Sequence, residues 1–196
     1  LRFCEHFITG LFSPAAPDVD LSGAALSNGV RFGGDAAARL GASCVALRSL
    51  LRWSLEGADI DSHVDGVRGI VTGVALNAPS FISVAGYVSA VGALAEAPRD
   101  AKNGAAVAAG LERLAGLQRA DGSWRGVDAF HVLDVLVRAT RLGHRSESSA
   151  GAVRRAAGML ALLQREEGAW GRETGPERML IGWRALRCAL AATRPA

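Results

Sequence analysis

The segment Leu-Gln-Arg-Ala-Asp-Gly-Ser-Trp at residues 117–124 recurs 46 residues later as Leu-Gln-Arg-Glu-Glu-Gly-Ala-Trp at residues 163–170. The similarity extends to both sides, since Leu114 matches Leu160 upstream and Arg138 matches Arg184 downstream. A fixed period of roughly 20 to 50 residues is typical of proteins in which one supersecondary unit is stacked several times. We therefore expect a repeated structural unit.

Each repeat has the pattern of two helices joined by a corner. Apolar residues at steps of four and three mark one helical face in residues 105–119, and the second copy follows the same steps. The glycine of each corner tolerates the backbone geometry that ends a helix. Second helices are expected over residues 127–142 and 176–192, with Pro176 at a favourable first position. The pattern predicts an all-α fold of helical hairpins with a period of 46 residues.

Four corner residues are predicted to act as structural clasps. A glutamine at a helix end can satisfy unpaired backbone groups, and an indole offers a large apolar face with one N–H to place. Direct contact with a ligand is the weaker interpretation of this pattern. The predicted clasps are Gln118, Trp124, Gln164 and Trp170.

The two corners resemble the QW motifs of squalene–hopene cyclases, class II terpene cyclases and prenyltransferase-type α/α toroids. The resemblance covers residues 105–192 and implies a ring of stacked helical hairpins. Six pairs at this period would take roughly 280 residues. With 196 residues the chain holds at most about four pairs. We expect a partial or reduced α/α toroid, formed by residues 1–196 as a single domain.

The upstream half lacks a clear third copy of the motif. Residues 1–34 are rich in Gly, Ser, Pro and Asp, which predicts a loop-rich segment with a short helix near residues 2–11. Asp35 is a suitable N-cap for a helix over residues 36–55, whose apolar stripe includes Leu40, Leu47 and Leu51.

Composition narrows the class of function. The net charge is +3, and arginines occur singly at helical spacing without a dense basic run. Aromatic residues make up 6% of the chain, which also argues against nucleic-acid binding. Three widely spaced cysteines predict no metal site and a reducing compartment, and thus a cytoplasmic protein.

Residues 69–95 contain no charged side chain. The stretch is long enough to span a membrane, but Asn77-Ala78-Pro79 divides it and small residues dilute its hydrophobicity. It therefore predicts two buried helices joined by a turn. The alternative is a peripheral membrane contact, which the family resemblance implies for enzymes that act on lipids.

The sequence Asp59-Ile-Asp61-Ser62-His63 is the closest match to the Asp-x-Asp-Asp acid motif of class II terpene cyclases. The resemblance implies that Asp61 is the proton donor, with Asp59 and His63 as neighbours, although Ser62 departs from the motif. A helix is expected to follow over residues 64–76. The alternative is a helix start stabilised by carboxylates, with an ion-paired solvated face.

A second group of polar residues lies on the helix expected over residues 127–142. His131, Asp134 and Arg138 share one face, and Asp134 and Arg138 have the spacing that favours an ion pair. Such a stripe is usually solvated. If the helix instead lines a cavity, His131 and Asp134 become an acid–base pair or a diphosphate-adjacent substrate site, and Arg138 with Arg184 an anion site.

Two functions remain open from the sequence. By resemblance, the protein is a terpene cyclase-like enzyme that cyclises an isoprenoid by proton initiation without a cofactor. Aromatic rings would then stabilise carbocations. The alternative is a non-catalytic helical module that binds an apolar ligand, forms a homodimer, binds a partner chain or completes a larger toroid. The aromatic candidates for substrate binding are Phe81, Tyr87, Phe130 and Trp183.

Overall fold

In the computed structural model, helices account for most of the described residues, which are 4–5, 12–26, 30–73, 82–165, 170 and 176–191. The fold class is all-α, as predicted. The helices within these ranges are α1 (Asp35–Arg52), α2 (Ala58–Gly73), α3 (Val84–Leu94), α4 (Ala101–Gly116), α5 (Ala129–Arg141), α6 (Glu147–Leu163) and α7 (Pro176–Ala191).

The N-terminal segment differs from its prediction. Instead of a short helix near residues 2–11, two strands, β1 (Cys4–Glu5) and β2 (Phe12–Ser13), pair antiparallel. Residues 14–26 and 30–34 are mostly irregular, as expected. Arg39 of α1 holds this segment by donating to the carbonyl oxygens of Ala16 and Pro17. Asp35 is the first residue of α1, and its side chain accepts a hydrogen bond from the Leu21 backbone N–H rather than capping the helix.

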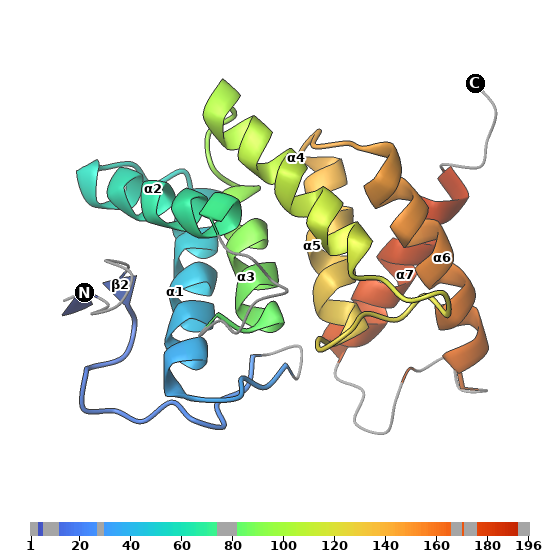
Figure 1. Ribbon diagram of the computed structural model, residues 1–196, viewed down its shortest axis with the longest axis horizontal. Coiled ribbons are helices and arrows are strands. Elements are labelled where there is room, and N and C mark those ends of the chain that lie inside the picture. Colours follow the sequence, from blue (N-terminus) through green and yellow to red (C-terminus); the bar gives the residue numbers. More distant parts are fainter. Residues whose placement is uncertain are drawn as a thin grey trace.

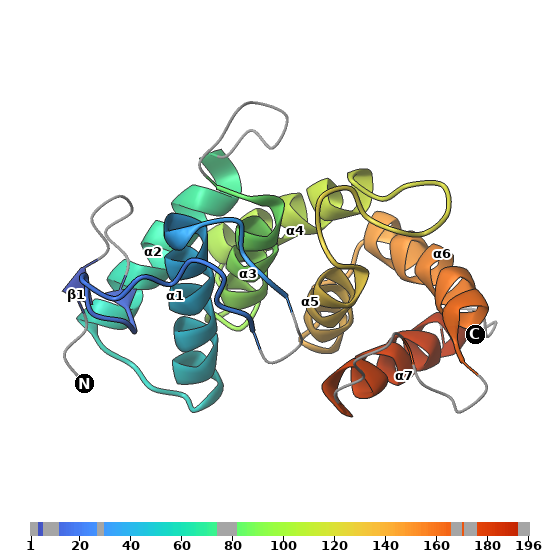
Figure 2. The same cartoon turned by 90° about the horizontal axis from the view of Figure 1, so that it is seen from below.

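The helices form two rows. The odd-numbered helices pack in succession, α1 on α3, α3 on α5 and α5 on α7. The even-numbered helices form a second row in the same order, α2 on α4 and α4 on α6. Neighbouring helices also pack between the rows, as α2 does on α3 and α6 on α7. Figures 1 and 2 show the chain advancing along these rows from α1 and α2 at one end of the molecule to α6 and α7 at the other.

One continuous apolar core lies between the rows and includes residues of all the named helices. Helix α3 is its centre, because every residue from Ala85 to Leu94 is buried. Small residues allow this close packing, since a Cβ on Gly92 would lie 2.9 Å from Val135 Cγ2 of α5. The uncharged stretch thus forms the end of α2 and the buried α3, while the predicted turn at 77–79 lies outside the described residues.

Within the described ranges, no helix combines the length and the apolar character needed to cross a membrane.

The two corners make matching contacts. Trp124 Nε1 donates to the Leu114 carbonyl oxygen at 2.7 Å, and Trp170 Nε1 donates to the Leu160 carbonyl oxygen at 2.8 Å. Both acceptors lie in the last turn of a helix, and the Leu114 oxygen also accepts from the Leu117 N–H at 3.3 Å. Each tryptophan is buried and forms an isolated bridge with the glutamine six residues before it, Gln118 or Gln164. The indole therefore ties each corner to the end of its own preceding helix.

Gln118 also connects the corner between α4 and α5 to helix α6. Its Nε2 donates to the carbonyl oxygens of Gly122 at 3.0 Å and Ala152 at 2.9 Å, and its Oε1 accepts from Arg155 Nε at 2.9 Å. Ala152 and Arg155 belong to α6, so one amide group joins the α4–α5 corner to the following helix. These are the contacts of a structural clasp.

Gly122 provides a test of this corner. Its φ is +86°, and an added Cβ would lie 2.7 Å from the Arg155 carbonyl oxygen. Gly126 also has positive φ, +71°, but the nearest atom to its Cβ would be 3.7 Å away. Gly122→Ala should therefore lower the free energy of unfolding by at least about 2 kcal/mol, and Gly126→Ala by about 1 kcal/mol, measured by urea denaturation. Equal losses of unfolding free energy in the two variants would mean that Gly122 is not in close contact with α6.

Candidate functional site

The predicted acid motif lies on the surface. Helix α2 begins at Ala58, so Asp59 and Asp61 occupy its first turn rather than a loop before it, and both are exposed. Carboxylates at this position interact favourably with the N-terminal end of a helix. A group that protonates an alkene must be shielded from water, and the exposure of Asp61 is instead what the alternative of a stabilised helix start predicts.

His63 does not accompany Asp61. Two residues apart on a helix, their side chains point about 200° from one another. The imidazole is 2% exposed, and burial lowers its pKa to about 4. His63 is therefore a neutral core residue at pH 7. On the exposed side of the same helix, Arg68 pairs with Asp65 and donates to Asn103 Oδ1 of α4 at 2.9 Å, an ion-paired face.

The aromatic candidates do not surround a common cavity. Tyr87 is fully buried in α3, and its hydroxyl donates to the Val71 carbonyl oxygen at 3.0 Å. Phe130 is buried against Trp170, with ring centroids 6.2 Å apart. Trp183 is half-exposed on α7, and Phe81 lies outside the described residues.

Two of these rings already stack with guanidinium groups. Arg178 lies 4.7 Å from the Phe130 centroid, and Arg187 lies 4.8 Å from the ring of Trp183. Their π-faces are therefore engaged within the protein.

The polar stripe on α5 faces the other helices of its row rather than solvent. His131 is buried, with Nε2 lying 3.1 Å from Ser89 Oγ and 3.2 Å from the Ala85 carbonyl oxygen of α3. Burial lowers its pKa and exceeds the opposing effects of the Ala85 hydrogen bond and Asp134. His131 therefore joins α5 to α3, and it is not among the residues that line the neighbouring pocket.

Asp134 and Arg138 bind partners on other elements instead of forming the expected ion pair with each other. Asp134 Oδ2 accepts from Arg48 Nη1 of α1 at 2.7 Å. Arg138 donates from Nε and Nη2 to the two oxygens of Glu96, at 2.8 and 2.9 Å. Long side chains can reach across helices where the rows pack closely, and bidentate pairing favours the cross-helix partner.

Glu96 is the centre of this network. Its side chain is 3% exposed and lies just after α3, where it also accepts from Arg52 Nε at 2.8 Å and approaches Arg48 Nε at 3.5 Å. Burial by itself would raise the pKa of Glu96, but hydrogen bonds from Arg138 and Arg52 outweigh it and keep the pKa below its usual value. The carboxylate is therefore ionised and links α1, α3 and α5.

Beside this network lies a pocket of about 300 Å³. Its lining comes from α1, α5 and α7, although α1 and α7 stand at opposite ends of the odd-numbered row. The row must therefore curve around the pocket, which lies on its concave side. The lining residues are Arg52, Asp134, Val137, Arg138, Arg141, Ile181 and Arg184.

Sequence reasoning placed Arg138 and Arg184 on a possible anion site but missed Glu96, Arg48 and Arg52. One signal was present, because Glu96 is the first charged residue after the uncharged run of residues 69–95. An acidic side chain at the end of a buried helix needs cationic partners. The sequence does not show which arginines supply them, since the partners are 44 and 42 residues away.

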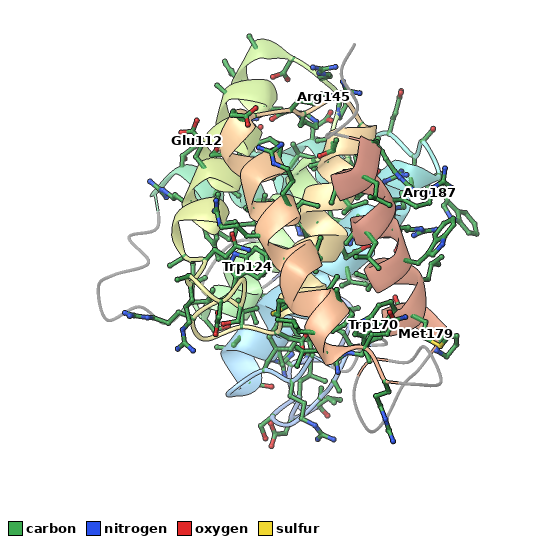
Figure 3. The ribbon with its side chains drawn as sticks, turned by 90° about the vertical axis from the view of Figure 1, so that its right-hand side faces the viewer. Glu112, Trp124, Arg145, Trp170, Met179 and Arg187 are labelled. Atoms are coloured by element: carbon green, nitrogen blue, oxygen red, sulfur yellow. The ribbon has the colours of Figure 1, made fainter. Side chains whose placement is uncertain are left out.

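The α6–α7 end of the molecule has a different character. Most of the large apolar side chains that are exposed in the described part of the chain lie on α6 and α7. Figure 3 looks onto this end and shows Met179 and Arg187 on the outer side of α7. The exposed set, called here the C-terminal apolar edge, consists of Leu162, Leu163, Met179, Leu180, Trp183 and Leu190.

The described residues contain no group of three or more His, Cys, Asp or Glu side chains placed to hold a metal ion. Comparison with known families, curated proteins and solved structures finds no match to this chain.

The low pKa of His63 predicts a pH-dependent stability. An imidazole in the unfolded chain takes up a proton near pH 6.5, whereas the folded one does so near pH 4. The contribution is therefore fully present above about pH 6.5 and is lost as the pH falls toward 4. Between pH 7 and 4, wild type should lose about 2 to 3 kcal/mol more unfolding free energy than His63→Leu in urea denaturation. Parallel profiles would contradict the buried neutral imidazole.

Glu96 predicts a pH dependence of the same sign, because its stabilising contribution is also lost as the pH falls. At pH 7, Glu96→Gln leaves Arg52 and Arg138 without their counter-ion and should reduce stability by about 3 kcal/mol. Because the pKa of Glu96 lies below its usual 4.5, wild type protonates it only at lower pH, and the gap between the two proteins should close there. Glu112→Gln removes the same charge from an exposed site on α4 and is the control. Equal losses in both variants would contradict the network.

Proposed function

We propose that the protein is a non-catalytic helical module of the partial α/α-toroid type, which binds helices of a partner chain on its C-terminal apolar edge. The two rows of helices and the matching tryptophan corners support a repeat architecture of this kind. The observation that carries the function is the concentration of exposed apolar side chains at α6–α7.

Helix α7 is apolar on two faces. Its buried face consists of Ile181 and three small residues, Gly182, Ala185 and Ala189, which pack toward α5 and α6. Its exposed apolar residues fall within an arc of about 100° on the opposite side. A helix that is apolar on both sides is typical of the interior of a helical stack. The exposed face therefore has the character of an interface rather than of an outer surface.

The partner's chemistry follows from what surrounds this face. Of the three arginines of α7, Arg178 pairs with Asp128 and Arg184 lines the concave pocket, whereas Arg187 lies against exposed Trp183. A helix or helical hairpin with an apolar stripe and an acidic residue opposite Arg187 would cover the edge and neutralise this charge. Stacking such a hairpin on α6–α7 would continue both rows in their existing order.

Three observations weigh against proton-initiated cyclisation of an isoprenoid by this chain alone. Asp61 is exposed, and the aromatic candidates among the described residues are dispersed. The concave pocket is lined by four arginines, and guanidinium groups would raise the energy of a carbocation intermediate. We therefore prefer the module to the enzyme.

The edge can be tested with Leu180→Ser/Trp183→Ser. If these side chains are a docking surface, the double variant should bind less of an apolar dye such as bis-ANS and keep its melting temperature within a few degrees. A photo-crosslinking residue at position 183 should then join the protein to helical segments of another chain in cells. The control position is Trp53, an exposed tryptophan at the end of α1.

Three outcomes would contradict the proposal. A large fall in melting temperature for the double variant would show that the edge is part of the fold. Equal crosslinking at positions 53 and 183 would show that partner chains do not bind the edge specifically. Formation of a cyclised product from linear isoprenoids, lost in Asp61→Asn, would establish the enzyme instead.

A further inference from the structure

The concave pocket between α1, α5 and α7 holds an excess of positive charge. Its walls carry four arginines, and Arg48 lies directly behind them in the Glu96 network. Against these five guanidinium groups stand two carboxylates, Glu96 and Asp134, which leaves an excess of three positive charges.

The two carboxylates are already engaged with particular arginines. Glu96 binds Arg52 and Arg138 and approaches Arg48, while Asp134 binds Arg48. Within the described part of the chain, Arg141 and Arg184 form no ion pair with a carboxylate. Their charges remain for something that enters the pocket.

The network also holds two further arginine side chains, Arg52 and Arg138, in place beside the pocket. Arg52 binds Glu96 through Nε, so its terminal nitrogens are not used in that contact, and Arg138 uses Nε and Nη2. Glu96 thus anchors the two side chains while part of each guanidinium group faces the pocket that both residues line. Donors held in place before binding lose less conformational entropy when a ligand arrives.

We propose that this pocket is a binding site for a small hydrophilic phosphate-bearing anion with at least two negative charges. Guanidinium groups match the oxygens of a phosphate group in geometry and charge. The pocket's volume of about 300 Å³ is at the lower end of the range for small-molecule sites. Of the described residues that line it, Val137 and Ile181 alone are apolar, so this lining offers little surface to a hydrocarbon tail.

Asp134 predicts that removing a negative charge changes anion binding in the opposite direction to removing a positive one. Its carboxylate lines the same pocket and opposes an anion, in part offset by Arg48. Removing its charge in Asp134→Asn should therefore strengthen binding, whereas removing the charge of an arginine should weaken it.

Isothermal titration calorimetry with inorganic pyrophosphate, at about 150 mM salt, tests the site. Wild type should bind saturably, and Arg141→Gln and Arg184→Gln should each weaken binding by about tenfold or more. Arg187→Gln is the matched control, because it removes the same charge from the same helix as Arg184 but outside the pocket lining. It should change the affinity by less than about twofold.

Arg141 is exposed and Arg184 half-buried, and circular dichroism spectra of both variants would verify that the fold is intact. An equal loss in Arg187→Gln would reduce the effect to general attraction by a basic surface and overturn the proposal. The absence of saturable binding would also overturn the proposal. A prenyl diphosphate that binds about tenfold more tightly than pyrophosphate would overturn it too, because this result would indicate a site for an apolar tail.

Discussion

The burial of Glu96 is the constraint on which the odd-numbered row of helices depends. A carboxylate that is 3% exposed must be matched by cations, and here three arginines from α1 and α5 meet it. The pairing fixes the end of α3 against both of its neighbours in the row. It also places arginine side chains around the concave pocket, so one buried charge contributes both to the fold and to the character of the pocket.

The two tryptophan corners stabilise the ends of the helices that precede them. Each tryptophan supplies a donor to a carbonyl in the last turn of the preceding helix. Gln118 adds contacts to the following hairpin through Ala152 and Arg155. These interactions are local or reach one neighbouring helix, which is what the proposed repeat architecture requires. The apolar face of α7 is where such stacking would continue.

Local patterns allowed a good part of the fold to be predicted. The helix expected over residues 127–142 is α5 at Ala129–Arg141, and α7 begins at Pro176 as anticipated. Predictions failed where the local signal was ambiguous. Helix α2 begins six residues before its expected start. Aspartates are as favourable in the first turn of a helix as in a loop, so Asp59 and Asp61 did not mark the boundary. The short pairing of β1 with β2 rests on a contact between segments that carry no clear strand pattern.

The sequence by itself determined the two tryptophan corners 46 residues apart and the all-α class, because helix periodicity and corner motifs are properties of short segments. Only the tertiary structure decided which groups the charges meet. Asp134 and Arg138 have the spacing of a helical ion pair, yet each binds a residue more than 40 positions away. The energy of a charge depends on its burial and on its neighbours in space, and neither is encoded in the spacing along one helix. For the same reason, the exposure of Asp61 and the curvature that joins Arg52 to Arg184 in one pocket became visible only in the folded chain.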